Sequence, residues 1–266
     1  MSHLPTVLVT GASSGIGQVY AERFAARGHD LVLVARDEAR MEAFAERLRR
    51  DVGVAADVVR ADLTDLADLE RIEARLQDDA RIGALINNAG ASLPDGFANQ
   101  SPEDMGRLIG LNVTAVTRLA AAIAPRLAAA GDGAIVNIAS VVGLAPEYGM
   151  AVYGATKAFV LYLSQALAFE LGPKGVYVQA VLPAATRTEI WERSGRDVNT
   201  IPGVMDVGDL VDAALVGFDR RESVTIPPLP DAAQWSAFDA ARQAMRTGFG
   251  NAQPAERYRV PALASV

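Results

Sequence analysis

Short apolar runs alternate with helical patterns along most of this sequence, and this alternation constrains the fold more than any other feature. The short runs are rich in β-branched and aliphatic residues, which is typical of buried strands. They cover residues 5–10, 31–35, 54–60, 83–86, 134–139, 176–182 and 223–226. Strands that alternate with helices predict a parallel sheet with helices on both faces. We therefore expect one doubly wound α/β domain of about seven strands over residues 1–266.

The pattern changes after residue 226, where prolines interrupt the alternation. A further helix is predicted over residues 231–245, and the residues beyond it show no regular period. We treat 227–266 as a C-terminal tail whose packing the sequence does not define.

Composition excludes several classes of function. A net charge of −7 argues against nucleic acid or an anionic membrane as a partner, because both require a basic surface. The absence of cysteine excludes disulfides, thiol nucleophiles and thiolate metal sites. With only His3 and His29, we expect neither a histidine triad nor a metal centre. The first strand begins without a signal-peptide pattern, and the apolar stretches are too short to span a bilayer, so we expect a cytoplasmic protein.

A glycine-rich turn, Gly11–Gly17, joins the first strand to the first helix. Glycines permit a tight turn and close backbone approach, and a helix N-terminus offers free N–H groups to an anion. The order of strand, turn and helix therefore predicts a site for the pyrophosphate of a dinucleotide, as in a Rossmann fold. A purely structural turn is the alternative.

Arg36 follows the second strand, at the position where dinucleotide-binding folds select their cofactor. An acid there holds the ribose 2′-hydroxyl, whereas an arginine accommodates a 2′-phosphate. Ala35 and Arg36 thus favour NADP over NAD. Alternatively, Arg36 is a surface charge at the start of the highly charged helix 37–50.

Three further polar positions interrupt the apolar pattern. Asp62 follows the third strand, where its carboxylate is placed either to accept from an adenine amino group or to cap the next helix. Asn88 and Gly90 belong to the turn after the fourth strand, which is either a plain turn or one that lies against a ligand. Asn112 lies among apolar residues of a long helix, so it is either a satisfied structural amide or part of a polar site.

Ser140, Tyr153 and Lys157 form the main candidate for chemistry. Tyr153 and Lys157 are four residues apart in a helical pattern, so both side chains leave the same helix face. A cation beside a phenol favours the phenolate, which allows proton exchange nearer neutral pH. Ser140 lies just before this helix at the end of a predicted strand. By itself such a pair is weak evidence, because pairs at this spacing also occur on solvated helices.

Together, these motifs closely resemble the short-chain dehydrogenase/reductase family, and the resemblance covers residues 4 to about 226. The motifs that carry it are Thr10-Gly11-Ala12-Ser13-Ser14-Gly15-Ile16-Gly17, Asn87-Asn88-Ala89-Gly90, Asn112, Ser140 and Tyr153-Gly154-Ala155-Thr156-Lys157. The resemblance implies an oxidoreductase that interconverts a carbonyl group and an alcohol by hydride transfer with a nicotinamide cofactor.

The resemblance also implies roles for individual residues. Tyr153 is the acid/base, Ser140 binds the substrate oxygen, Lys157 binds the nicotinamide ribose and lowers the pKa of the tyrosine, and Asn112 holds a water of a proton relay. The implied cofactor-binding residues are Gly11, Ser13, Ser14, Gly15, Ile16, Gly17, Arg36, Asp62, Leu63, Asn88, Ala89, Gly90, Tyr153, Lys157, Pro183, Thr186 and Thr188. Within that set, Asp62 is expected at the adenine, Asn88 at the adenosine side and Thr188 at the carboxamide.

Two positions depart from the family pattern. Ala184 stands where members often have a glycine, which weakens the assignment of Thr188. Ser13 and Ser14 stand where NADP-preferring relatives often carry a basic residue, so the expected preference for NADP(H) over NAD(H) depends on Arg36 alone.

The substrate is expected to be uncharged or hydrophobic, because the candidate pocket residues are mostly apolar. They are Leu93, Val141, Val142, Tyr148 and Trp191. A 3-oxoacyl carrier-protein reductase is one alternative, and a non-enzymatic cofactor-binding regulator is another. Alanine-rich helices that are apolar on more than one face predict a homodimer or homotetramer.

Overall fold

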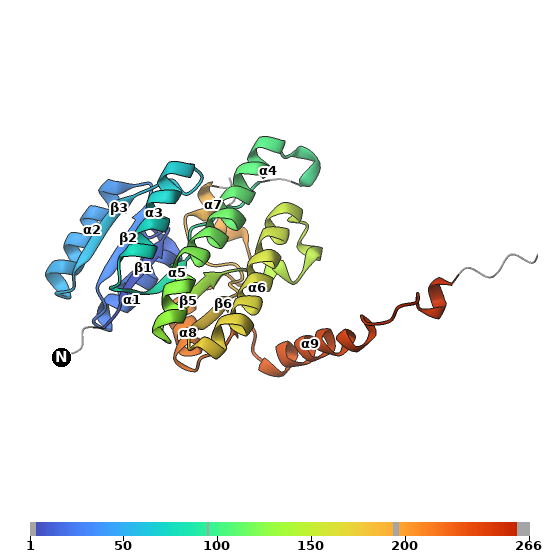
Figure 1. Cartoon of the computed structure of the whole chain (residues 1–266). Coiled ribbons are helices and arrows are strands. Elements are labelled where there is room, and N and C mark those ends of the chain that lie inside the picture. Colours follow the sequence, from blue (N-terminus) through green and yellow to red (C-terminus); the bar gives the residue numbers. More distant parts are fainter. Residues whose placement is uncertain (1–3, 95, 194–196, 260–266) are drawn as a thin grey trace, which may run out of the picture. The chain divides into compact units, whose positions relative to one another are not determined.

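The computed structural model describes residues 4–94, 96–193 and 197–259, and the chain divides at Pro228 into two compact units. The first unit contains a seven-stranded sheet in the order β3-β2-β1-β4-β5-β6-β7, with every neighbouring pair parallel (Figure 1). The strands are β1 Thr6–Thr10, β2 Leu31–Ala35, β3 Ala56–Arg60, β4 Ile82–Asn87, β5 Ala134–Ile138, β6 Tyr177–Val181 and β7 Val224–Thr225. This architecture confirms the predicted doubly wound sheet.

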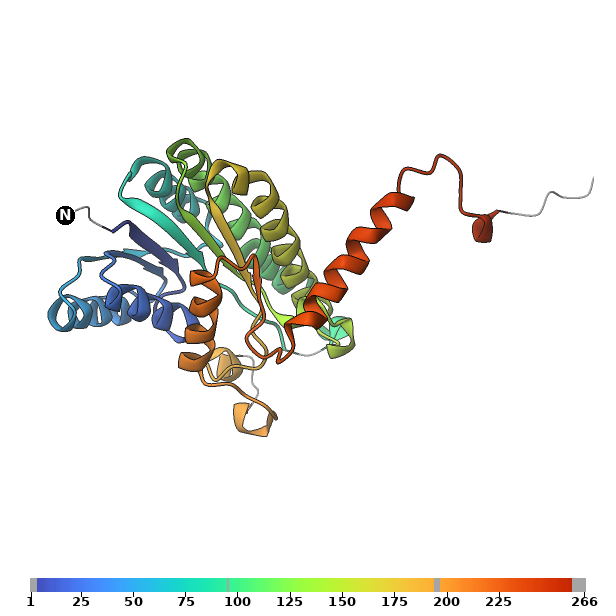
Figure 2. The ribbon, with the colours of Figure 1, turned by 90° about the horizontal axis from the view of Figure 1, so that it is seen from below.

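Helices cover both faces of the sheet (Figure 2). They are α1 Gly15–Ala26, α2 Glu38–Asp51, α3 Leu66–Asp78, α4 Pro102–Ile109, α5 Val116–Ala130, α6 Ala151–Leu171, α7 Ile190–Arg193 and α8 Val207–Asp219. One buried cluster joins the sheet to α1, α2 and α8, and a second joins the opposite face to α3 and α5. Strand order reverses between β1 and β4, and in such sheets ligands bind beyond the carboxyl ends of the strands at this point.

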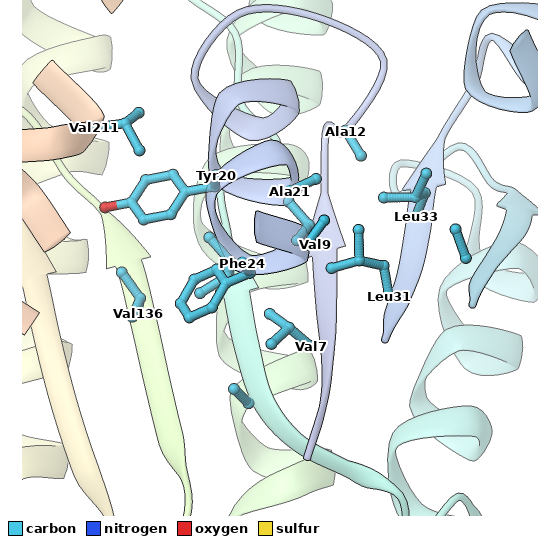
Figure 3. Close-up of a cluster of buried hydrophobic side chains, with 14 of the residues drawn as sticks. Val7, Val9, Ala12, Tyr20, Ala21, Phe24, Leu31, Leu33, Val136 and Val211 are labelled. Atoms are coloured by element: carbon cyan, nitrogen blue, oxygen red, sulfur yellow. The ribbon is translucent and has the colours of Figure 1, made fainter. Parts of the chain in front are cut away.

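Aromatic rings anchor α1 to the sheet. Figure 3 shows Tyr20 and Phe24 reaching from α1 toward Val136 of β5 and Val211 of α8. Both rings are almost completely buried, and burying a large apolar side chain contributes roughly 1.5–3 kcal/mol. The packing of α1 fixes the position of the glycine turn at its N-terminus.

The helix that contains Asn112 is longer than its apolar run indicates. Helices α4 and α5 are joined without a break by a π-helical segment, Gly110–Ala115. Within the described residues, the resulting stretch Pro102–Ala130 is the one helix long and apolar enough to cross a membrane by length and composition. Half of its apolar 18-residue window is buried inside the fold, and core helices of soluble proteins pass the same test.

The second unit begins at Leu229, two residues after the start of the predicted tail. Its helix α9, Ala232–Ala244, is capped by the Asp231 side chain, which accepts from the backbone N–H of Ala233 at 2.8 Å. The rings of Trp235 and Phe238 lie 5.5 Å apart on this helix. Within the described residues 229–259, none is buried.

Candidate active site

The glycine turn leaves the N-terminus of α1 open. Asp or Ser side chains cap α2, α3, α4 and α8, whereas α1 begins without a side-chain cap at Ser14, as α5 and α6 do at their own starts. Gly11 and Gly15 adopt left-handed conformations, with φ of 67° and 56°. A Cβ on Gly17 would lie 2.5 Å from the carbonyl oxygen of Gly11. These features fit an anion such as a pyrophosphate, because the backbone is tightly folded and its first helical N–H groups point outward.

Thr10 and Asn88 hold this turn in place. The Thr10 hydroxyl accepts from the backbone N–H groups of Asn88 and Ala89, both at 3.0 Å. The Asn88 side chain donates to the carbonyl oxygens of Thr10 at 2.8 Å and Gly11 at 3.3 Å. The Asn88 amide therefore fastens the β4 turn to the glycine turn, which is a positioning role in addition to its predicted place beside adenosine. Thr10 was not among the predicted site residues, although its place directly before the glycine turn was a signal.

Arg36 and Asp62 lie together at the carboxyl edge of β2 and β3. The Arg36 side chain is 71% exposed, and its Nη1 lies 3.9 Å from Asp62 Oδ2. Asp62 Oδ1 accepts from the backbone and hydroxyl of Thr64. Although burial opposes it, these hydrogen bonds and Arg36 lower the pKa of Asp62. The cap of α3 is Asp65 rather than Asp62, so Asp62 does not serve the competing capping role. Its neighbour Leu63 is buried.

Ser140 follows β5 in extended backbone and begins the short turn that leads toward α6. Its hydroxyl donates to the carbonyl oxygen of Pro183 and accepts from the backbone N–H of Val142, both at 3.2 Å. These contacts tie the end of β5 to the segment after β6. Ser140 also acts on the Tyr153 phenol, because its side chain lowers the pKa of that group.

Tyr153 and Lys157 lie one turn apart on α6, as their spacing predicted. Lys157 is buried, and its Nζ donates to the carbonyl oxygen of Ile138 at 2.7 Å. The same Nζ lies 5.8 Å from the centre of the Tyr153 ring. Burial of an ammonium group costs free energy, and such groups cluster at functional sites. Lys157, buried beside a tyrosine ring, is therefore a candidate functional group.

The pKa shifts of Tyr153 and Lys157 differ from the expectation that Lys157 lowers the pKa of the tyrosine. Burial raises the pKa of the Tyr153 phenol, and the Ser140 side chain only partly opposes that shift. Burial also lowers the pKa of Lys157 to about 8. The expected lowering of the tyrosine pKa by Lys157 is therefore not found in this chain, because loss of hydration disfavours both charged forms. Tyr153 is a neutral phenol at neutral pH, which suits a proton donor.

Asn112 lies at the centre of a buried polar cluster. Its Oδ1 accepts from the backbone N–H of Ala91 at 3.0 Å, and its Nδ2 donates to the Ala91 carbonyl at 2.9 Å and the Thr156 hydroxyl at 3.1 Å. A Cβ on Gly90 would lie 3.3 Å from Asn112 Oδ1 and 3.5 Å from Lys157 Nζ, so these groups converge on one point.

The backbone around Asn112 bears on its two interpretations, a structural amide and part of a polar site. Asn112 lies in the π-helical segment, a form of helix that is frequent at functional sites. Asn112 is thus a satisfied amide that lies near the lysine, and its part in a polar functional site stays a prediction. Thr156 was missed in the sequence, although its place between Tyr153 and Lys157 was a signal.

The segment after β6 closes the site on its other side. Thr186 is buried, and its carbonyl oxygen accepts from the Trp191 indole N–H at 2.7 Å. The Thr188 side chain lies against Gly15, where an added Cβ would be 3.1 Å from Thr188 Cγ2. Pro183, Thr186 and Thr188 therefore come to the same edge of the sheet as the glycine turn.

The predicted pocket residues follow three different strands. Leu93 follows β4, Val141, Val142 and Tyr148 follow β5, and Trp191 lies in α7 after β6. All five are thus at the carboxyl edge, but Tyr148 is 64% exposed. Their contact with a substrate remains a prediction.

Comparison with known proteins identifies the family. A family model described as short chain dehydrogenase matches residues 5–199. The chain belongs to the short-chain dehydrogenase family. The resemblance seen in the motifs is thereby confirmed, and so is the expected class, an oxidoreductase that acts on CH–OH groups.

Two solved structures are similar over nearly the whole chain. A short-chain dehydrogenase from Sphingobium yanoikuyae in complex with NADPH is 67% identical, with a TM-score of 0.95 over 96% of this chain and 100% of that chain. The bulky-bulky ketone specific alcohol dehydrogenase from Comamonas testosteroni is 59% identical, with a TM-score of 0.90 over 97% and 99% of the two chains.

Curated relatives are more distant. Sulfoacetaldehyde reductase of Chromohalobacter salexigens is 35% identical, over 87% of this chain and 96% of its own length. The match to hydroxysteroid dehydrogenase-like protein 1 of Gallus gallus, at 31% identity over 69% of this chain, spans only 56% of that protein. Relatives with such different names show the family but not one shared substrate.

Proposed function

We propose that this protein is an NADP(H)-dependent oxidoreductase that interconverts a ketone or aldehyde and an alcohol, with Tyr153 as the acid/base. The observation that carries the proposal is the group formed by Ser140, Tyr153 and buried Lys157 at the carboxyl edge of the sheet, after β5. The NADPH in the similar Sphingobium structure and the exposed Arg36 both support the cofactor.

The substrate class that we propose is a hydrophobic ketone with a bulky group on each side of the carbonyl. The name of the Comamonas enzyme supports this choice, since that protein is 59% identical to this chain. The apolar side chains of Leu93, Val141 and Val142, which are partly exposed, fit such groups. A 3-oxoacyl thioester is the comparison substrate that tests the alternative.

In this mechanism the bound nicotinamide supplies or accepts the hydride, and the residues of the chain handle the proton and the substrate oxygen. The Tyr153 hydroxyl donates its proton to the carbonyl oxygen in reduction and takes it back in oxidation. Ser140 turns its hydroxyl from the Pro183 carbonyl to that oxygen and stabilises the developing charge. Buried Lys157 is placed to hold the nicotinamide ribose, and Asn112 orders the path by which the proton is replaced.

Replacement of the phenol tests this function. Tyr153→Phe should lower kcat for reduction of a bulky ketone by NADPH by about 10²- to 10⁴-fold, the usual contribution of a positioned acid. Tyr162→Phe is the matched control, because Tyr162 lies on the same helix but is 73% exposed. Unchanged activity in Tyr153→Phe would contradict the proposed chemistry and revive the regulator alternative.

We also propose that the protein forms a homodimer or homotetramer in the cytoplasm. Phe159, Tyr162 and Phe169 of α6 are exposed at spacings of three and seven residues, so they share one helix face. A second copy would cover this apolar face. Light scattering at micromolar concentration tests the proposal, and a monomer would contradict it.

A further inference from the structure

One ion pair joins two segments that the sequence does not connect. The two Nη atoms of Arg40 donate to the two carboxylate oxygens of Glu189, at 3.0 and 2.6 Å. The residues are 149 positions apart. Arg40 lies in the first turn of α2, and its backbone N–H donates to the Asp37 cap. Glu189 directly precedes α7.

Each partner of this pair lies close in the sequence to a proposed cofactor-binding residue. Arg40 is four residues after Arg36, which follows β2 at the position expected to select the 2′-phosphate. On the other side, Thr188 contacts Gly15 of the glycine turn, so the segment that carries Glu189 runs beside the proposed pyrophosphate site. The ion pair therefore connects the adenosine end of the cleft with the segment over the turn.

The exposure of this ion pair favours exchange of partners over a contribution to the stability of the fold. The side chains of Arg40 and Glu189 are 45% and 35% exposed, and ion pairs in such positions contribute little free energy. Glu189 offers Arg40 the same forked contact that a phosphate offers, but with one negative charge instead of nearly two. A 2′-phosphate placed beside Arg36 would compete effectively for Arg40.

We propose that Arg40 is a second cation for the 2′-phosphate, and that Glu189 is the carboxylate that occupies it until NADP(H) binds. This inference rests on the proposed function and deepens it. Ser13 and Ser14 provide no basic residue in the glycine turn. The exchange supplies a second guanidinium for the 2′-phosphate from α2 instead. NAD(H) has no 2′-phosphate, so with that cofactor Arg40 stays paired with Glu189. Binding of NADP(H) alone releases the segment that carries Trp191.

Cofactor titration of three variants tests the exchange. Glu189→Gln removes the competitor, so it should tighten NADPH binding about fivefold, and Arg40→Gln should weaken NADPH binding at least as much. NADH affinity should change less than about twofold in both, since NADH does not engage Arg40. In the double variant, the benefit of Glu189→Gln should disappear because the guanidinium for which Glu189 competes is gone.

A matched control exists in the same chain. Arg27 and Asp219 form a similar two-pronged exposed pair between α1 and α8, at 2.8 and 2.9 Å, so Asp219→Asn should leave both affinities unchanged. Equal weakening of NADPH and NADH by Glu189→Gln would overturn the exchange and make the pair a clamp on any dinucleotide. Unchanged affinities in all variants would make it an ordinary surface ion pair. Failure of the unmodified protein to bind either cofactor would instead overturn the proposed function itself.

Tryptophan fluorescence gives a readout that needs no catalysis. The chain has two tryptophans, so a Trp235→Phe background leaves Trp191, two residues after Glu189. Adenosine 2′-monophosphate should shift Trp191 emission, whereas adenosine 5′-monophosphate should not. The shift should be absent when Arg40→Gln is added. A shift that persists with Arg40→Gln, or none in the background protein, would contradict release of the segment by exchange at Arg40.

Discussion

The two ends of the proposed cofactor cleft use polar groups in opposite ways. At the catalytic end, Asn112, Thr156 and Lys157 are buried, and each has a hydrogen bond of 3.1 Å or less. At the adenosine end, Arg36 is 71% exposed, and its acidic neighbour Asp62 is 3.9 Å away. Buried groups keep one geometry, because leaving any of them unpaired is costly. Exposed charges act over distance and exchange partners at little cost.

This difference indicates which end of the proposed cleft needs a fixed side-chain geometry. Proton transfer requires atoms held within a few tenths of an ångström, whereas recognition of a charged phosphate tolerates movement of long side chains. Substitutions at the catalytic end should therefore change rate and stability. Those at the adenosine end should change affinity and its dependence on salt.

After Tyr153→Phe, Ser140→Ala should produce the largest effect. Loss of one hydrogen-bond donor to a developing oxyanion lowers kcat by about 10²- to 10³-fold, so we expect that loss with little change in NADPH binding. The control is Ser164→Ala, on the same helix as Tyr153. Ser164 is equally buried and accepts from Asn137 at 2.9 Å, but it is not near Tyr153 in the proposed chemistry. It should lower the free energy of unfolding by about 1–3 kcal/mol while kcat is retained. Similar kcat losses in both variants would show that the buried network acts as one structural unit.

Lys157→Met should show the energetic cost of the buried ammonium. The pKa of Lys157 is lowered to about 8 from an ordinary value of 10.5, so the folded state binds fewer protons than the unfolded state between these pH values. The stability of the unmodified protein should therefore rise by about 3 kcal/mol from pH 8 to 10.5, relative to the variant. Below pH 8 the difference should be constant. Urea unfolding at several pH values measures it, and parallel pH profiles would contradict the assigned shift.

Much of the fold followed from local patterns. The strand predicted at 31–35 matches β2, and the helix predicted to end near Leu171 ends there. Parallel strands buried on both faces give continuous apolar runs, so their sequence signal is strong. The π-helical segment around Asn112 was not predictable, because its apolar pattern matches that of an ordinary helix.

The site was predictable where one motif carries it and not where distant segments meet. Tyr153 and Lys157 share one helix, so their spacing was sufficient. The pair between Arg40 and Glu189 joins the first turn of α2 to the segment before α7, and neither residue has a local pattern that distinguishes it from other surface charges. The direction of the Tyr153 pKa shift was also missed, because it depends on burial, which spacing does not report.

Arg36→Ala should produce a smaller effect than the substitutions at the catalytic end, and it tests the comparison of the two ends most directly. Loss of one exposed cation should weaken NADPH binding about tenfold at low salt and leave NADH binding nearly unchanged. Because the Arg36 side chain is 71% exposed, raising the salt from about 0.05 M to about 0.5 M should reduce the difference between Arg36→Ala and the unmodified protein.

Arg50→Ala is the matched control for this substitution, since Arg50 is equally exposed at the far end of α2 and pairs with its neighbour Asp51. A loss of NADPH affinity that salt does not reduce would mean that Arg36 is held in a fixed, dehydrated contact. The adenosine end would then resemble the catalytic end, and the contrast between exchangeable and fixed polar groups would fail. Salt sensitivity in Arg36→Ala but not in Arg50→Ala would place the exchangeable charge at the 2′-phosphate position, where a few solvated cations are enough to select one dinucleotide.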